Sequence, residues 1–443
     1  MSTDRDGRAA SALGWVARPL VVSALLTGLV LRLAFGLGYW VDKPLTHDEH
    51  EYLLLAENIA AGRGFQYLLP DGAAAPGEHF GRAPLYPLWL AGVMRLTGEG
   101  LGAAGSAPDG TRAPSPALVW AIKITQAGLG VLIVGLMAWL AQRAAGPAAA
   151  AIGAWLAALY PPLIWTPAYV LSETLYSALA LGCVVLIENG VRTGTPMPRS
   201  GRVALGRPDA WRITAAGVLA GLAVLTRPAM LFFVGLAVPW MWRRRGVPAA
   251  GLLLLSTLLV VAPWTVRNLG EYGRFVLVAS EGGITFWTGN HPLATGEGDM
   301  AANVAIKRAN VAFRAAHPGL SPEQLEPLYY QDAIGWIVAH PFRFAQLLAQ
   351  KAFYTVVPVG PSYQLHSPRY FWASVLAYLA VLPFGVLGLI RRAAPQPLLV
   401  LASASVLVCL VFFPQERFRI PVIDPTLLVC AASWGAARMG HAA

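Results

Sequence analysis

Long apolar runs recur along the chain, separated by arginine clusters or by prolines and glycines. The runs over 20–31 and 251–262 contain no charged residue. A helix needs about 20 mostly apolar residues to cross the hydrocarbon core of a bilayer. The pattern therefore predicts about ten membrane-spanning helices, over 19–41, 116–141, 147–165, 168–188, 212–228, 229–242, 248–266, 371–390, 395–414 and 420–437.

Residues 212–242 allow two interpretations. Divided at Arg227-Pro228, they form two helices that rise only about 25 and 21 Å, against about 30 Å of hydrocarbon. A single kinked span is the alternative, and it would place the arginines at 243–245 outside and invert every later loop. We favour the short hairpin because it keeps those arginines on the side of the other basic clusters.

The composition supports a membrane protein. Of the 443 residues, 56% are hydrophobic and 13% are charged, about half the charged share of an ordinary soluble domain. These values exclude a soluble globular enzyme, a disordered chain and a collagen-like chain. A net charge of +10 would in a soluble protein raise the question of nucleic-acid binding. In a membrane protein the question is which side carries the charge.

The basic residues sort onto one side of the predicted topology. Fifteen arginines and only four acidic residues fall on the side of the two termini, and the rest of the chain is nearly neutral. By the positive-inside rule that side is cytoplasmic. The charge therefore reports orientation, and we expect no nucleic-acid partner. Lone Arg32, in the first span, is interpreted as snorkelling to the interface.

We treat 1–443 as a single transmembrane domain. The topology leaves two large extracytoplasmic segments, about 42–115 and 267–370, and a cytoplasmic loop at about 189–211. Apolar stretches at 84–93 and 342–357 within the outer segments predict helices that lie along the membrane surface. Cys183, Cys409 and Cys430 lie in apolar runs without C-x-x-C spacing, and are interpreted as small buried hydrophobes.

Ionisable residues gather on the predicted outer side, where they are candidates for chemistry. The segment 46–52 reads Thr-His-Asp-Glu-His-Glu-Tyr, directly after the first span. Its adjacent carboxylates, Asp48 and Glu49, cannot share a helix face, so one can point into a cavity while a partner holds the other. A carboxylate in an apolar cavity suits a general base. A solvated helix start, in which both acids favour the helix dipole, is the alternative.

Two further motifs place charge near the outer helix ends. Arg82 and Tyr86 flank the prolines of 81–87, and Arg82 can either bind a phosphate or snorkel. Glu173 and Arg227 lie at matching depth in their spans. They can belong to a site or form a structural ion pair.

The later outer segments carry polar residues of two kinds. Arg267-Asn268 and Gly289-Asn290 offer groups for a hydroxyl-rich substrate, or form plain turns. Glu416-Arg417-Phe418-Arg419 sits in a very short turn between spans nine and ten. Two arginines and a glutamate there are typical of an anion cradle for a diphosphate or phosphodiester, and interfacial anchoring is the alternative.

No metal, cofactor or nucleotide site stands out. His47 and His50 are three residues apart, so a divalent cation is possible, but no third fixed ligand supports one. The chain has no Walker motif and no glycine-rich loop after a strand. If the substrate is a sugar donor that is used outside the cytoplasm, where nucleotide sugars are absent, the donor must be carried by lipid.

The ordered set of motifs resembles the C-type superfamily of integral-membrane glycosyltransferases. The resemblance is specifically to bacterial members of glycosyltransferase family 39, which are similar to protein O-mannosyltransferases and to the aminoarabinose transferase that modifies lipid A. It covers nearly the whole chain. Ala83 and His291 depart from the pattern, where a second proline and an asparagine are common. The motifs that carry it are Asp48-Glu49 with Tyr52, Arg82 with Pro84-Leu85-Tyr86-Pro87, Leu171-Ser172-Glu173, Leu225-Thr226-Arg227-Pro228, Pro263-Trp264 with Arg267-Asn268, Gly289-Asn290 with Pro292, and Arg417-Phe418-Arg419 with Pro421.

The resemblance implies an all-α polytopic enzyme of the bacterial cytoplasmic membrane, with both termini in the cytoplasm and the active site outside. It implies a polyprenyl-phosphate sugar as donor, membrane lipids around the protein, a glycan, lipid or protein acceptor, and inversion at the anomeric carbon. Asp48 would be the base, and Glu49 would orient it or bind an adjacent group. The donor phosphate and lipid would be bound by Arg82, Arg227, Arg267, Arg417 and Arg419, and the substrate by Tyr86, Glu173, Asn268, Asn290 and Glu416.

Two alternatives from other classes stay open. A polytopic transporter or lipid flippase would carry its polar residues near the bilayer midplane, on broken helices. A non-catalytic membrane relative could serve as an assembly partner. The enzyme interpretation predicts that Asp48, Arg82 and Arg417 meet in one outward-facing cavity.

Overall fold

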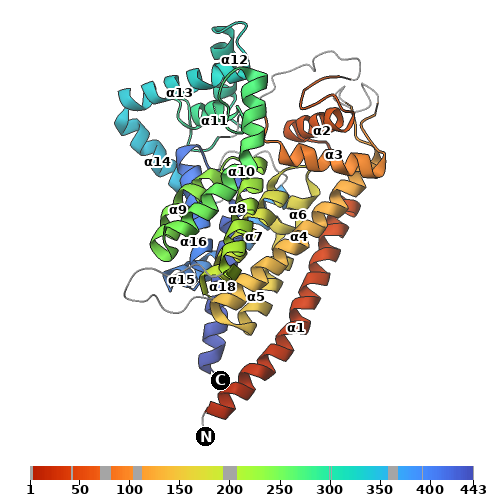
Figure 1. Ribbon diagram of the computed structural model, residues 1–443, viewed down its shortest axis with the longest axis vertical. Coiled ribbons are helices and arrows are strands. Elements are labelled where there is room, and N and C mark those ends of the chain that lie inside the picture. The colour runs from red at the N-terminus through yellow and green to blue at the C-terminus, as the bar shows by residue number, and fades with distance from the viewer. Residues whose placement is uncertain are drawn as a thin grey trace.

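The computed structural model describes residues 3–40, 43–69, 81–102, 112–192, 207–298, 300, 302–357, 368–391 and 393–442. Helices dominate this part of the chain, and no β-strand occurs in it, so the predicted all-α class is confirmed. In Figure 1 the long helices run along one axis, and both termini lie at the same end of the molecule. The helices are α1 (Thr3–Leu33), α2 (His47–Ala60), α3 (Leu85–Thr97), α4 (Pro116–Ala145), α5 (Pro147–Leu159), α6 (Pro161–Trp165), α7 (Glu173–Arg192), α8 (Arg207–Thr226), α9 (Met230–Arg245), α10 (Val247–Tyr272), α11 (Gly282–Gly289), α12 (Val304–Ala315), α13 (Pro322–Ala339), α14 (Pro341–Val356), α15 (Pro368–Ile390), α16 (Gln396–Val411), α17 (Glu416–Arg419) and α18 (Ile423–Ala442).

Five described helices are long and apolar enough to cross a bilayer: Ala17–Tyr39, Pro116–Ala145, Asp209–Thr226, Val247–Tyr272 and Pro368–Ile390. The first of them combines α1 with the π-helix Ala34–Tyr39 that continues it. A sixth crossing is possible where Pro147–Leu159 and Pro161–Ala168 meet at an angle of 66°. The protein is therefore a multi-pass membrane protein, as the hydropathy pattern predicts. Each of the other predicted spans also coincides with a helix, but α9 and α16 have only 16 residues each.

The chain breaks at Arg227-Pro228, where the two-helix interpretation of 212–242 places the turn. Thr226 ends α8 and Met230 begins α9. Pro228 has no N–H to donate and its ring excludes the preceding turn of helix. The Met230 N–H instead donates to the Arg227 carbonyl at 3.1 Å. In Figure 1, α8, α9 and α10 lie side by side, and α10 packs on both of its neighbours.

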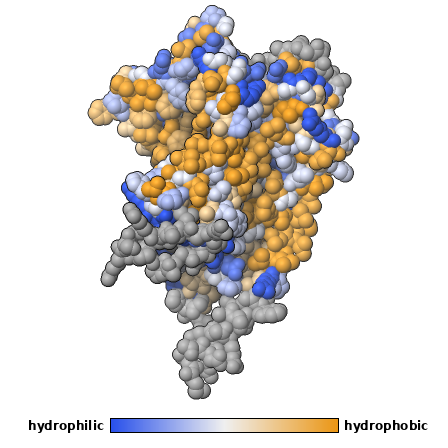
Figure 2. Space-filling view, viewed as in Figure 1, coloured by the Kyte–Doolittle hydropathy of each residue, from blue (hydrophilic) through white to orange (hydrophobic). Residues whose placement is uncertain are grey.

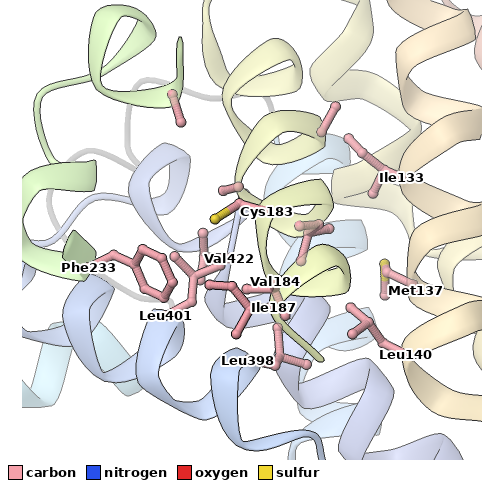
Figure 3. Close-up of a cluster of buried hydrophobic side chains, with 14 of the residues drawn as sticks. Ile133, Met137, Leu140, Cys183, Val184, Ile187, Phe233, Leu398, Leu401 and Val422 are labelled. Carbon is pink, nitrogen blue, oxygen red and sulfur yellow. The ribbon is translucent and has the colours of Figure 1, made fainter. Parts of the chain in front are cut away.

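The main core lies where α4, α7, α8, α9, α16 and α18 meet. Figure 3 shows Cys183 of α7 within this cluster of apolar side chains, with Phe233, Leu401 and Val422 among those drawn. Cys409 and Cys430 are likewise buried and free, which confirms the interpretation of the cysteines. Alanines are frequent in this cluster. Small side chains allow helices to approach closely, the usual basis of packing inside a membrane.

Arg32 does not snorkel, so that interpretation is wrong. Its side chain is 2% exposed and lies inside the bundle. Nη1 donates to the Gly28 carbonyl at 2.9 Å, and Nη2 donates to the Ala157 carbonyl of α5 at 3.2 Å. A hydropathy pattern does not distinguish the lipid-facing side of a span from its bundle-facing side, which is why the pattern missed this contact.

Two groups of helices lie at the end of the molecule away from the termini. Figure 1 shows α2 and α3 on one side of this end and α11, α12, α13 and α14 on the other. Figure 2 shows hydrophilic residues gathered over this end, above a broad apolar band over the long helices. The predicted apolar stretches 84–93 and 342–357 fall in α3 and α14.

Glu326 of α13 makes one of these groups sensitive to pH. Its carboxylate accepts hydrogen bonds from the backbone N–H groups of Gly282 and Gly283, but burial outweighs them and raises its pKa to about 7. Since the pKa is raised on folding, this group's contribution to stability is fully present below its ordinary pKa and is lost as pH rises through about 7.

We therefore expect Glu326→Gln to melt about 2–4 °C higher than the parent protein at pH 8. The gap should shrink to nothing at pH 5, because the parent carboxyl is then neutral. Melting curves of both proteins in detergent across pH 5–8 measure this. A constant gap at all pH values would contradict the assignment.

Candidate active site

Asp48 and Glu49 sit in the first turn of α2 and point to different partners. Thr46 caps this helix: its hydroxyl accepts from the Glu49 N–H, and Glu49 Oε2 accepts from the Thr46 N–H at 2.7 Å. Glu49 Oε1 accepts from the Val170 N–H, also at 2.7 Å. Burial raises the pKa of Glu49 against the effect of these hydrogen bonds. Glu49 thus ties α2 to the segment before α7, and Asp48 faces elsewhere, which confirms the predicted divergence of the two carboxylates.

Asp48 lies between two guanidinium groups. Its Oδ1 accepts from Arg82 Nη2 at 2.7 Å, and its Oδ2 accepts from Arg417 Nη2 at 2.7 Å. Burial alone would raise the pKa of this carboxyl, but the two cations hold it well below its usual range. Asp48, Arg82 and Arg417 therefore meet as predicted, although Arg82 and Arg417 are 34 and 369 positions away from Asp48 along the chain. That the three residues line one outward-facing cavity stays a prediction.

Arg82 has acidic partners besides Asp48. It also forms ion pairs with Glu51 and with Glu281, the latter at 3.1 Å, and its guanidinium lies 5.3 Å from the centre of the Tyr52 ring. Burial alone would lower the pKa of Arg82, but these acids together raise it well above its usual value. Glu51 and Glu281 are acidic partners of the site that the motif analysis did not select. Glu51 follows one helical turn after His47, in the same acidic segment, which is the signal that could have identified it.

A second ion pair adjoins the first. Arg227 Nη1 lies 2.7 Å from Glu173 Oε1, and Arg417 Nε lies 3.7 Å from the same oxygen. The guanidinium groups of Arg227 and Arg417 lie 5.1 and 5.7 Å from the Phe418 ring. The Arg417 side chain is 40% exposed, so the group remains accessible. We call the set formed by Asp48, Arg82, Glu173, Arg227 and Arg417 the arginine cluster.

Arg419, only two residues from Arg417, lies elsewhere. Its Nε is 2.8 Å from Asp424 Oδ1, and its guanidinium covers the Tyr378 ring at 3.9 Å. Asp424 also accepts from the Tyr160 hydroxyl at 2.8 Å. With 3% of its surface exposed, Arg419 belongs to a separate buried ion pair.

Several other predicted site residues contact the protein's own backbone and side chains. Asn268 Nδ2 donates to the carbonyls of Val276 and Val278. Arg267 stacks on Trp264, with its guanidinium 4.9 Å from the ring. Tyr86 donates to Gln126 Oε1 at 3.2 Å.

Glu416 is also held apart from the arginine cluster. It accepts from the Ser374 hydroxyl. Burial raises its pKa to about 6.

The Gly289-Asn290 motif fixes the end of α16. Asn290 Nδ2 donates to the Val411 carbonyl at 2.9 Å. Lys351 Nζ donates to Asn290 Oδ1 at 2.8 Å and to the Leu410 carbonyl at 3.1 Å. The chain runs from this helix end into α17, which carries Arg417. Lys351 was missed by the motif analysis, although a lone lysine within the apolar stretch 342–357 is a recognisable signal.

His47, Asp48 and Glu51 offer three ligand atoms within 4.8 Å of one another. The two carboxylates are ion-paired with Arg82. A divalent cation would have to displace this guanidinium, so the donor set does not favour a metal ion over the arginine.

The geometry joins an all-helical membrane bundle to a cluster of arginines and carboxylates at one end. The chain is similar in structure to the archaeal oligosaccharyltransferase AglB from Archaeoglobus fulgidus in complex with an inhibitory peptide and a dolichol-phosphate, with a TM-score of 0.57, 16% identity, and coverage of 96% of this chain and 51% of that one. The structure of the same oligosaccharyltransferase with Zn and sulfate gives a TM-score of 0.56, 15% identity, and coverage of 96% and 49%. A weaker likeness, with a TM-score of 0.40, 16% identity, and coverage of 97% and 78%, is to ArnT from Cupriavidus metallidurans in the apo state.

The chain therefore shares the all-helical membrane fold of this oligosaccharyltransferase, which agrees with the predicted fold class. The chain spans about half the length of the oligosaccharyltransferase. No protein-family model matches the sequence. No curated protein matches it either.

Proposed function

We propose that the protein transfers a sugar from a polyprenyl-phosphate donor to an acceptor hydroxyl at the outer face of the bacterial cytoplasmic membrane. The observation that carries this proposal is the Asp48 carboxylate, held at 2.7 Å by guanidinium groups from two distant segments. Paired guanidinium groups are the usual means of binding a phosphate. A site that binds phosphate beside an ionised carboxylate has both parts that this reaction needs.

The arginines can serve the carboxylate and the phosphate in turn. In the reaction the acceptor hydroxyl gives its proton to Asp48, its oxygen bonds to the anomeric carbon, and the bond from that carbon to the phosphate oxygen breaks. Asp48 loses a negative charge as the departing phosphate gains one. Arg82 and Arg417 can shift from the carboxylate to the phosphate, which raises the proton affinity of Asp48 when it is needed and stabilises the leaving group.

A single displacement with one base inverts the anomeric carbon. A phosphate leaving group needs little protonation, so a second carboxyl acid is unnecessary, in contrast to glycoside hydrolases. Arg227 adjoins Arg417, because both pair with Glu173. Arg227 therefore adds a further positive charge near the phosphate. Glu49 orients this site through the cap of α2.

The fold supports the choice of donor. AglB binds a dolichol-phosphate and an inhibitory peptide, and a lipid-linked donor is the corresponding substrate class here. We place both termini in the cytoplasm and the arginine cluster outside, because the arginines beside the termini follow the positive-inside rule. The acceptor is a glycan, a lipid or a protein.

We expect Arg417→Gln to weaken the binding of undecaprenyl phosphate about 10–100-fold, since a charge-assisted hydrogen bond is worth about 1.5–3 kcal/mol. Arg95→Gln is the matched control, because Arg95 is exposed and its hydrogen bonds to described residues go to the carbonyls of Ile59 and Ala60. Thermal stabilisation of the purified proteins by the lipid measures binding. Equal loss in both variants, or in neither, would contradict the phosphate site.

The reaction itself needs a second measurement. The purified protein is incubated with a bacterial envelope extract as the source of acceptor hydroxyls and with a panel of undecaprenyl-phosphate sugars that carry a labelled sugar, and release of undecaprenyl phosphate is followed. Turnover of at least one donor is expected. Lipid binding without cleavage of any donor would favour a lipid transporter instead.

A further inference from the structure

Arg32 is a buried cation without an acidic partner among the described residues. Its two terminal nitrogens donate to the carbonyls of Gly28 and Ala157. Its Nε is buried and has no hydrogen-bond partner in the part of the chain that the structure describes. An unsatisfied buried N–H of a charged group costs several kcal/mol, so a partner for this group is expected.

Two other buried polar groups also lack a hydrogen-bond partner in the described part of the chain, and they indicate where the partner of Arg32 lies. Glu173 Oε2 and Thr174 Oγ1 are also buried and without a hydrogen-bond partner among the described residues. The three side chains are 2–3% exposed. All three line one cavity, together with Gly130 and Ser177, and its volume for the centre of a water molecule is about 10 Å³.

We propose that this cavity holds one structural water molecule that joins Arg32 to Glu173. The water accepts from Arg32 Nε, donates to Glu173 Oε2, and makes its third hydrogen bond with the Thr174 hydroxyl. Buried waters typically make about three such bonds to otherwise unpaired polar groups, and a volume of about 10–15 Å³ suffices for one. The chemistry of the lining excludes an anion, because Glu173 is part of it, and the size excludes anything larger than water.

The water connects the first helix to the arginine cluster. Glu173 presents Oε1 to Arg227 and Arg417, lines the cavity, and has a buried Oε2 without a hydrogen-bond partner among the described residues. Arg32 therefore acts as a positioning residue: through the water it fixes the orientation of the Glu173 carboxylate. This consequence for donor binding rests on the proposed function, whereas the water site itself does not.

Thr174→Val tests the water by the sign of the change in stability. Valine has the shape of threonine without the hydroxyl. If the water is present, it loses a partner and the melting temperature falls. If it is absent, removal of an unpaired hydroxyl leaves the melting temperature unchanged or raises it. Thr174→Ser keeps the hydroxyl and is expected to melt above the valine variant.

Thr288→Val is the matched control. Thr288 Oγ1 is likewise buried, with 2% of the residue exposed, and no described residue forms a hydrogen bond with it, but Thr288 does not line this cavity. Valine there is expected to be neutral or stabilising. A Thr174→Val protein that is as stable as the parent or more stable would overturn the proposal.

Two further measurements separate the water from the proposed function. Density at high resolution should show a water within about 3.2 Å of Arg32 Nε and Glu173 Oε2, and its absence would overturn the site. Thr174→Val should weaken undecaprenyl phosphate binding several-fold, and Thr174→Ser should not. A Thr174→Val protein that is destabilised but binds the lipid normally would support the water site and overturn its link to the donor site.

Discussion

Asp48→Asn is expected to give a folded protein whose sugar transfer falls about 10²–10⁴-fold, the range typical of a lost general base. Asparagine has the shape of aspartate but cannot take the acceptor proton. The fold should persist because Arg82 keeps Glu51 and Glu281, and Arg417 keeps Glu173. Transfer of a labelled sugar by the purified variant, compared with its melting temperature, measures both effects. Full transfer by Asp48→Asn would remove the mechanism.

Glu49→Gln is the natural control for this variant. The two oxygens of Glu49 accept from two backbone N–H groups, and an amide can accept from only one of them. We therefore expect a lower melting temperature for Glu49→Gln, with transfer per folded molecule within about tenfold of the parent. A stable but inactive Glu49→Gln protein would indicate that Glu49 is the base and that Asp48 has the positioning role.

The hydropathy pattern predicted the helices because an apolar run in a membrane has few alternatives to helix. It also placed the break at Pro228, where the chemistry of proline decides the outcome. It did not predict the inward orientation of Arg32. The side of a helix that faces the bundle depends on packing with distant helices, and Arg32 bonds to Ala157, 125 residues away.

The site was predictable in part. Residues on one helix turn could be assigned to opposite directions, as with Asp48 and Glu49. Arg417 and Arg419 likewise lie about 200° apart around a helix axis, and of these two arginines Arg417 reaches the arginine cluster whereas Arg419 pairs with Asp424. The pairing of Asp48 with Arg417 could be anticipated only from the resemblance, since nothing local links residues 369 positions apart.

Asn290 illustrates why polar residue types are ambiguous. An amide that donates and accepts suits a sugar hydroxyl and a helix end equally well. Here Asn290 donates to the carbonyls of Phe286 and Val411 and accepts from the Lys351 ammonium. Burial lowers the pKa of Lys351 to about 7. The motif therefore acts on the site at a distance, by fixing the helix end that leads to Arg417.

This positioning makes Gly289→Ala the substitution for which we expect the largest loss of stability. A β-carbon at this position would lie 1.9 Å from the Phe412 carbonyl oxygen and 2.7 Å from its carbon. Both atoms belong to the backbone, so no side-chain rotation relieves the overlap, and α11 and the end of α16 must move apart. Overpacking of this kind typically costs about 1–3 kcal/mol or more. Because the displaced segment leads into α17, undecaprenyl phosphate binding should weaken as well.

Gly92→Ala is the control, because Gly92 lies within α3 and a β-carbon there would meet no atom within 4 Å. Alanine in an exposed helix position is favoured over glycine by about 0.5–1 kcal/mol, so this variant should melt at the parent temperature or slightly above it. Melting curves and lipid-dependent stabilisation of the two variants measure the difference. If Gly289→Ala melted normally but bound undecaprenyl phosphate poorly, the motif would contact the lipid directly, and the role assigned to it through Phe412 and Arg417 would be wrong.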